Sequence, residues 1–151
     1  KVIDVVHVRW AASTAVTALD LCGVELAVRH GALDFWTKKA PVLDRVEAVV
    51  TRLGGVLPQW ACVWLESVLR DPGYETLKKT RDPLVHRFLV RSALLWTTVP
   101  TGHQWRTEFE VPNPERMDSR PSARQLILLA RDVADRHVRA FGGALQWNTT
   151  P

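Results

Sequence analysis

Residues 5–26, with the sequence VVHVRWAASTAVTALDLCGVEL, decide the fold class through the spacing of their apolar side chains. The apolar positions recur in steps of three and four: Val5, Val8, Ala12, Ala15, Leu19, Cys22 and Leu26. Such spacing places these residues on one face of an α-helix. Arg29, His30 and Gly31 form a suitable helix end, with cations in the last turn and a glycine beyond it. The segment therefore predicts one long helix.

Three further helices are predicted in the first two thirds of the chain. One begins near Pro41, which suits the first helical turn, and stops at Gly54-Gly55. The next begins around Pro58 and carries an apolar face. The fourth begins near Asp82-Pro83 and extends through Trp96.

The last part of the chain predicts a loop followed by a fifth helix. Residues 98–121 contain four prolines and no apolar period, which indicates a long surface loop. The fifth helix begins at Ser122, with Gln125 as its capping-box partner, and is expected to end at Gly142-Gly143. The β-branched runs have helical rather than alternating spacing. The sequence therefore predicts an all-α protein, an antiparallel bundle of four to five helices forming a single domain over residues 1–151.

Composition narrows the class of protein. A chain of 151 residues that is 46% hydrophobic and 24% charged is typical of a globular domain. It contains no uninterrupted apolar run of about 20 residues, so we expect no membrane span and no membrane partner. The start at Lys1, without Met or an apolar signal core, suggests a trimmed chain or a domain of a longer protein. Cys22 and Cys62 lie in apolar stretches, which favours buried, reduced thiols and a cytoplasmic protein.

The charge balance is mildly basic. The net charge is +4 with a pI near 9.5, and most of the 20 basic residues are arginines. Arginine favours bidentate contacts with phosphate or carboxylate, so nucleic acid is a reasonable partner.

The chemistry of the chain is concentrated in residues 77–88, LKKTRDPLVHRF. Asp82 is a good helix N-cap and Pro83 suits the first helical position. Arg81 would then lie just outside the helix, and His86 on its first full turn. Both side chains would converge beside a helix N-terminus, which favours an anion. Further positive charge lies nearby on Lys78, Lys79, Arg87 and Arg91. The stretch predicts a phosphate-sized site, with a surface cap and an incidental histidine as the alternative.

Two other segments repeat parts of this motif. Arg131 and His137 have a similar spacing and an intervening aspartate, but six residues within a helix turn the side chains about 240° apart. His137 also lies on the apolar stripe, so we interpret it as a packed core histidine. Arg70-Asp71-Pro72 repeats the tripeptide of residues 81–83 without a following histidine, which suggests turn chemistry. Trp60 and Trp64 lie one turn apart, and packing is favoured over base stacking for them.

The motif Arg81-Asp82-Pro83-Leu84-Val85-His86 resembles that of the HEPN superfamily. Its ribonuclease members carry Arg, four to six residues and then His, often with Asn or Asp after the Arg, in a helical bundle. The resemblance implies metal-independent RNA cleavage without a cofactor, in which the ribose 2′-hydroxyl attacks the adjacent phosphorus and leaves a 2′,3′-cyclic phosphate. His86 would move the proton, Arg81 would hold the phosphate oxygens, and Asp82 would orient Arg81. RNA-binding roles would fall to the neighbouring cations Lys78, Lys79, Arg87 and Arg91.

The resemblance also implies partners. Members of the family usually pair as homodimers, and some act as toxins with an antitoxin or regulatory partner in defence. Some of these toxins continue His-x-Tyr, and the partner antitoxin adenylylates that tyrosine. Phe88 occupies this position here, so neutralisation at this residue is excluded. Non-catalytic members also exist, so a helical binding module for RNA, a nucleotide or a protein is the alternative function.

Overall fold

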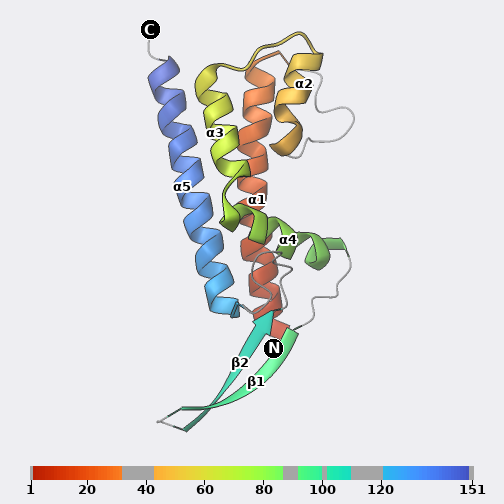
Figure 1. Cartoon of the computed structure of the whole chain (residues 1–151), viewed down its shortest axis with the longest axis vertical. Coiled ribbons are helices and arrows are strands. Elements are labelled where there is room, and N and C mark those ends of the chain that lie inside the picture. Colours follow the sequence, from red (N-terminus) through yellow and green to blue (C-terminus); the bar gives the residue numbers. More distant parts are fainter. Residues whose placement is uncertain (1, 32–42, 87–91, 100–101, 110–120, 150–151) are drawn as a thin grey trace.

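The fold is a helical bundle with a β-hairpin at one end (Figure 1). The computed structural model describes residues 2–31, 43–86, 92–99, 102–109 and 121–149. Within these ranges the helices are α1 (Val2–Arg29), the short 3-10 helix η2 (Leu43–Arg45), α2 (Val46–Arg52), α3 (Gln59–Leu69), α4 (Pro72–His86) and α5 (Ala123–Thr149). The prediction of a helical bundle is confirmed.

Helix α1 is the centre of the bundle. It packs against α5, α4 and α2, and α3 packs against α5. In Figure 1, α3 runs antiparallel to α1 and α5, whereas α1 and α5 run parallel to each other. The expected antiparallel arrangement therefore holds for α3 but not for the pair α1 and α5. The start of α5 lies at the same end of the bundle as the start of α1, near the hairpin and α4.

The predicted apolar face of α1 forms one side of the core. Val8, Ala12, Leu19 and Leu26 are almost fully buried. The helix ends where the sequence suggests, because Gly31 adopts a φ of +102°, a backbone conformation that disfavours side chains with a Cβ. The first helix is therefore confirmed, from its buried face to its glycine stop.

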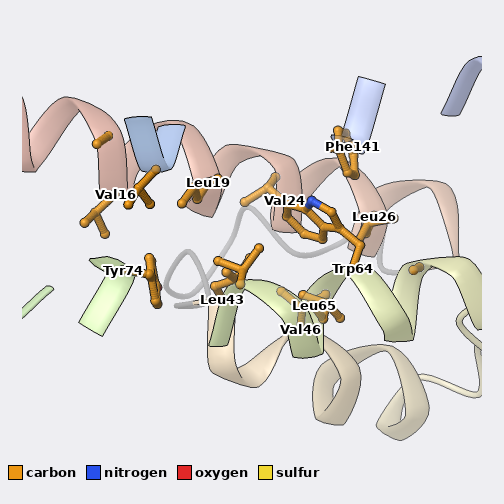
Figure 2. Close-up of a cluster of buried hydrophobic side chains, with 14 of the residues drawn as sticks. Val16, Leu19, Val24, Leu26, Leu43, Val46, Trp64, Leu65, Tyr74 and Phe141 are labelled. Atoms are coloured by element: carbon orange, nitrogen blue, oxygen red, sulfur yellow. The ribbon is translucent and has the colours of Figure 1, made fainter. Parts of the chain in front are cut away.

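Aromatic side chains join α3 to α5. The ring centroids of Trp64 and Phe141 lie 4.9 Å apart, and those of Trp60 and Phe141 lie 6.2 Å apart. The Trp64 indole Nε1–H donates a hydrogen bond of 2.9 Å to the backbone oxygen of His137. Figure 2 shows Trp64 and Phe141 within one apolar cluster together with Leu26 of α1. The prediction that these tryptophans pack in the protein is confirmed.

The predicted loop over residues 98–121 is wrong where the structure describes it. Strands β1 (Ser92–Val99) and β2 (Gly102–Phe109) form an antiparallel hairpin, with Trp96 paired to Trp105. Helix four was also expected to run through Trp96, which lies in β1 instead. Aromatic and β-branched residues favour strands, but a strand is stable only when it pairs with a second strand. Neither the sequence of β1 nor that of β2 shows by itself that the two segments pair. Residues 110–120 of the predicted loop lie outside the described part of the chain.

Helix α5 begins as predicted and ends later than predicted. Ser122 and Gln125 form the reciprocal capping box: the Ser122 N–H donates to Gln125 Oε1 over 2.8 Å, and the Gln125 N–H donates to Ser122 Oγ over 3.3 Å. Gly142 and Gly143 do not end the helix, which continues to Thr149. Burial of Phe141 and packing of Leu145 against the core outweigh the low helix propensity of two glycines.

This continuation makes a simple prediction about Gly142. A Cβ built on Gly142 meets no atom within 4 Å, so alanine fits without a clash. Gly142→Ala should raise the free energy of unfolding by about 0.5–1 kcal/mol, because alanine has the higher helix propensity and restricts the unfolded chain. Urea unfolding followed by circular dichroism measures the change. An unchanged or lower midpoint would contradict a helix that continues through Gly142.

Helix α1 has one property that composition did not anticipate. The stretch Val6–Arg29 is long and apolar enough to cross a membrane by length and composition alone, and 44% of its most apolar window is buried inside the protein. The core helix of a water-soluble protein meets the same criteria. Composition alone therefore does not exclude a membrane span, whereas the packing of α1 against α4 and α5 fits a core helix.

Candidate functional site

The helix that carries the Arg-His motif begins eleven residues earlier than the sequence suggested. Its cap is Asp71, whose Oδ1 accepts a hydrogen bond of 2.7 Å from the Gly73 N–H, with Pro72 at the first helical position. Helix α4 then continues through Arg81-Asp82-Pro83 to His86. The predictions that Asp82 caps a helix and that Pro83 begins one are therefore wrong. The helix cap and the first helical proline are instead Asp71 and Pro72, which belong to the first copy of the Arg-Asp-Pro tripeptide.

This shift removes the helix N-terminus from the motif. Because α4 is continuous, Arg81 and His86 occupy positions five residues apart on one helix, about 140° apart around its axis. The positive end of the α4 dipole lies at Pro72. Any anion at Arg81 must therefore be held by side chains rather than by free N–H groups of a helix start.

Arg81 is held between two carboxylates from different parts of the chain. Its Nε donates to Asp82 Oδ1 over 3.1 Å, and its Nη1 donates to Asp20 Oδ2 of α1 over 3.3 Å. The side chain of Arg81 is 18% exposed. The expectation that Asp82 orients Arg81 agrees with the first contact. The second contact involves a residue that the sequence reading did not identify.

Asp20 connects α1 to η2 as well as to α4. Its Oδ1 accepts a hydrogen bond of 3.2 Å from the Leu43 N–H. Burial raises the pKa of Asp20 above its ordinary value, and the Leu43 hydrogen bond and the Arg81 charge oppose this rise without cancelling it. Because each oxygen of this partly buried carboxylate accepts a hydrogen bond, the Asp20 side chain is held in one position within the site.

Tyr74 lies in the same region of α4 and is almost fully buried. Burial, together with the negative charge of Asp20, raises the pKa of the Tyr74 phenol well above its ordinary value, so the hydroxyl stays protonated. Among the described residues this hydroxyl has no hydrogen-bond partner. The ring of Tyr74 packs within the hydrophobic core (Figure 2).

The other predicted site residues fall into two groups. Lys78 pairs with Asp44 over 3.4 Å, and Lys79 pairs with Glu75 over 2.6 Å. The side chain of His86 and all of Arg87 and Arg91 lie outside the described part of the chain. The structure therefore brings Arg81, Asp82 and Lys78 together with Asp20 and Asp44, two carboxylates that were not predicted. Each described cation of the predicted site has an acidic partner.

A second polar cluster surrounds the start of α4. His137 Nε2 lies 2.7 Å from Asp71 Oδ2, and Arg136 Nη1 lies 3.1 Å from the same oxygen. Burial alone would raise the pKa of Asp71, but hydrogen bonds from His137 and Gly73 and the neighbouring cations lower it overall. The interpretation of His137 as a packed core histidine is confirmed, since it is 5% exposed. Its buried carboxylate partner was not predicted.

The cysteines and the acidic residues give no sign of redox or metal chemistry in the described ranges. Cys22 and Cys62 are free and partly buried, and burial raises the pKa of Cys22 to about 11. In residues 2–31, 43–86, 92–99, 102–109 and 121–149, no group of three or more His, Cys, Asp or Glu could hold a metal ion.

One sequence signal for Asp20 was available. It is a carboxylate between Leu19 and Leu21, within a long apolar stretch of α1. Acidic residues are rarely buried without a partner, so such a position predicts a basic residue across the interface. The identity of that residue, Arg81, required the structure.

Comparisons of this chain with protein-family models, with curated proteins and with solved structures find no match. The function is therefore inferred from the residues and the geometry of the site alone.

Proposed function

We propose that this protein is a HEPN-like, metal-independent endoribonuclease that acts at Arg81 and His86. The observation that carries the proposal is the fixed guanidinium of Arg81. Asp82 and Asp20 occupy its Nε and Nη1, and neither uses Nη2. The helical bundle and the resemblance of the motif at residues 81–86 to that of HEPN ribonucleases support the same function, whereas the separation of Arg81 and His86 by about 140° around one helix does not.

The Nη2 group of Arg81, which has no hydrogen-bond partner among the described residues, suits the chemistry of RNA cleavage. Nη2 can donate two hydrogen bonds to non-bridging phosphate oxygens as charge develops on them in the transition state. His86 takes up the proton of the attacking 2′-hydroxyl as the P–O5′ bond breaks, and the leaving 5′-oxygen is protonated to a 5′-hydroxyl. Asp82 orients Arg81. The requirement for a 2′-hydroxyl makes RNA, rather than DNA, the substrate.

The same proposal covers RNA binding, the oligomeric state and the cellular setting of the protein. Lys78, Lys79, Arg87 and Arg91 bind the RNA backbone, and a homodimer places a second copy of the motif beside the first. The protein acts in the cytoplasm without a cofactor, in a toxin or defence setting with an antitoxin or regulatory partner.

One observation favours a non-catalytic binding module as the second candidate. Lys78, Lys79 and Arg81 each have an acidic partner, so the described part of the cluster offers little unpaired positive charge. A protein that only binds RNA, a nucleotide or another protein shows no cleavage product under any condition. Its RNA binding weakens as salt rises.

Lysine substitutions at the two Arg-Asp-Pro tripeptides test the proposed function. Arg81→Lys keeps the positive charge beside Asp20 but loses the planar fork that binds phosphate, so cleavage in EDTA should fall about 10- to 100-fold. Arg70→Lys is the matched control, because Arg70 is exposed and, among the described residues, its ion pair is with Glu66 on the same helical stretch. Gel analysis of labelled RNA measures both rates. Equal rates for Arg81→Lys and the wild-type protein would refute a role for Arg81 in cleavage.

A further inference from the structure

The partly buried carboxylate of Asp20 has two hydrogen-bond partners, one at each of its oxygens. Oδ1 accepts the hydrogen bond from the Leu43 N–H, and Oδ2 accepts the hydrogen bond from Arg81 Nη1. The side chain of Asp20 is 21% exposed. Asp20 is therefore a bridge between η2 and α4, supplied by α1.

The Leu43 side of this bridge is rigid. Leu43 is 1% exposed and packs closely on α1 at Gly23, where an added Cβ would lie 2.7 Å from Leu43 Cδ1. Such close packing leaves little room for η2 to move along α1. The Leu43 N–H therefore fixes the direction in which Asp20 presents its second oxygen to Arg81.

On the Arg81 side of the bridge, one nitrogen of the guanidinium, Nη2, has no hydrogen-bond partner among the described residues. Asp82 and Asp20 bind Nε and Nη1 from two directions, and no described residue binds Nη2. Two restraints at separate nitrogens fix both the position and the plane of the group. Because the planar fork must match the phosphate oxygens, small errors in this plane reduce transition-state binding.

We propose that Asp20 is a positioning residue, which holds Arg81 so that its Nη2 edge receives the non-bridging oxygens of the scissile phosphate. This inference rests on the proposed ribonuclease activity. Asp20 contacts Arg81 and not the RNA, so its entire effect on cleavage passes through the guanidinium.

The substitution Asp20→Asn tests this role with minimal change in shape. The asparagine oxygen still accepts the Leu43 hydrogen bond, while an NH₂ group replaces the oxygen that accepts from Arg81. Asp44→Asn is the matched control, because Asp44 is a carboxylate of the same cluster that pairs with Lys78 and not with Arg81. Thermal unfolding of both variants establishes that they fold.

We expect Asp20→Asn to lower kcat for RNA cleavage about 10- to 100-fold, because the guanidinium loses one of its two restraints. KM should change less than about threefold, because binding of the RNA backbone is retained. Asp44→Asn should leave kcat unchanged. In an Arg81→Lys background, adding Asp20→Asn should change kcat less than about twofold, because the group through which Asp20 acts is already absent.

Three kinetic results would overturn the proposal. The first is that Asp20→Asn cleaves as fast as the wild-type protein. The second is that it cleaves faster, which would show that the carboxylate competes with the phosphate for Arg81. The third is that Asp20→Asn lowers the rate of Arg81→Lys by the same factor as that of the wild-type protein, which would show an effect independent of Arg81.

A measurement without RNA separates this proposal from the proposed function. The Nε–Hε signal of Arg81 in a ¹⁵N spectrum, assigned by its loss in Arg81→Lys, reports the fixation of the guanidinium. The signal should shift and broaden in Asp20→Asn but not in Asp44→Asn, and an unchanged signal refutes the positioning contact. If the wild-type protein cleaves no RNA, the proposed function fails, and the spectrum still decides whether Asp20 holds Arg81.

Discussion

Replacing His86 by alanine should lower the rate of RNA cleavage by about 10²- to 10⁴-fold, the usual contribution of a positioned general acid or base. The 2′-hydroxyl is a weak nucleophile until its proton is removed, and Arg81 cannot accept a proton at neutral pH. His86 is the titratable group of the motif and ends the helix that carries Arg81. Initial rates on labelled RNA in EDTA measure the loss.

His7→Ala is the control for this substitution. His7 is an exposed histidine of α1, and it has no role in the proposed site. Both variants should retain the melting temperature of the wild-type protein, and only His86→Ala should lose activity. Full activity of His86→Ala, or equal loss in both variants, would contradict the assignment of the proton transfer to His86.

The second large effect concerns Asp71, at the start of α4. Asp71→Ala should lower the free energy of unfolding by about 2–4 kcal/mol, the combined cost of losing a helix cap and of leaving buried polar groups unpaired. The substitution removes the cap on the Gly73 N–H and leaves the buried His137 and the neighbouring Arg136 without their shared carboxylate. Denaturant unfolding gives the difference in free energy.

Asp82→Ala is the matched control, since Asp82 has the same place in the second Arg-Asp-Pro tripeptide. It caps no helix, and its side chain is 45% exposed. Its loss should cost less than about 1 kcal/mol, as for most exposed ion pairs. Equal destabilisation by the two substitutions would contradict the assignment of Asp71 as the cap and of Asp82 as a surface partner.

The stabilisation by Asp71 should also depend on pH. Hydrogen bonds and neighbouring cations outweigh burial and lower the pKa of Asp71 below its ordinary value of 3.8. An acid with a lowered pKa in the folded state stabilises that state above its ordinary pKa, and the contribution is lost as the pH falls through the lowered value. The difference in stability between the wild-type protein and Asp71→Asn should therefore shrink below pH 3.8. A constant difference would show that ionisation of Asp71 is not involved.

The sequence predicts the elements that depend on local signals. The apolar face of α1, its stop at Gly31, and the capping box of Ser122 and Gln125 all involve residues within a few turns of one another. Spacing and capping rules describe such contacts directly. These elements occur where they were predicted.

Elements that depend on distant partners were misplaced. The two Arg-Asp-Pro tripeptides are identical, and only the first begins a helix, where Asp71 also binds His137 at a distance of 66 residues along the chain. The strands of the hairpin and the continuation of α5 past Gly142 likewise depend on pairing and on core packing. Long-range contacts of this kind override local propensity and are not visible in a short window.

The candidate site shows the same division. Arg81 and Asp82 are adjacent in the sequence and in contact in the structure, as predicted. Asp20 lies 61 residues before Arg81, and no local pattern connects the two. The convergence of Arg81 and His86 was inferred from a helix start at Asp82, and that start does not exist.

The most direct test of the central claim is analysis of the RNA ends after incubation of the wild-type protein with RNA in EDTA. Attack by the 2′-hydroxyl leaves a 2′,3′-cyclic phosphate on one fragment and a 5′-hydroxyl on the other. The proposed function predicts these ends for the wild-type protein, and at least about 100-fold less of the same product for His86→Ala at equal time. Intact RNA, or ends with a 5′-phosphate, would contradict it.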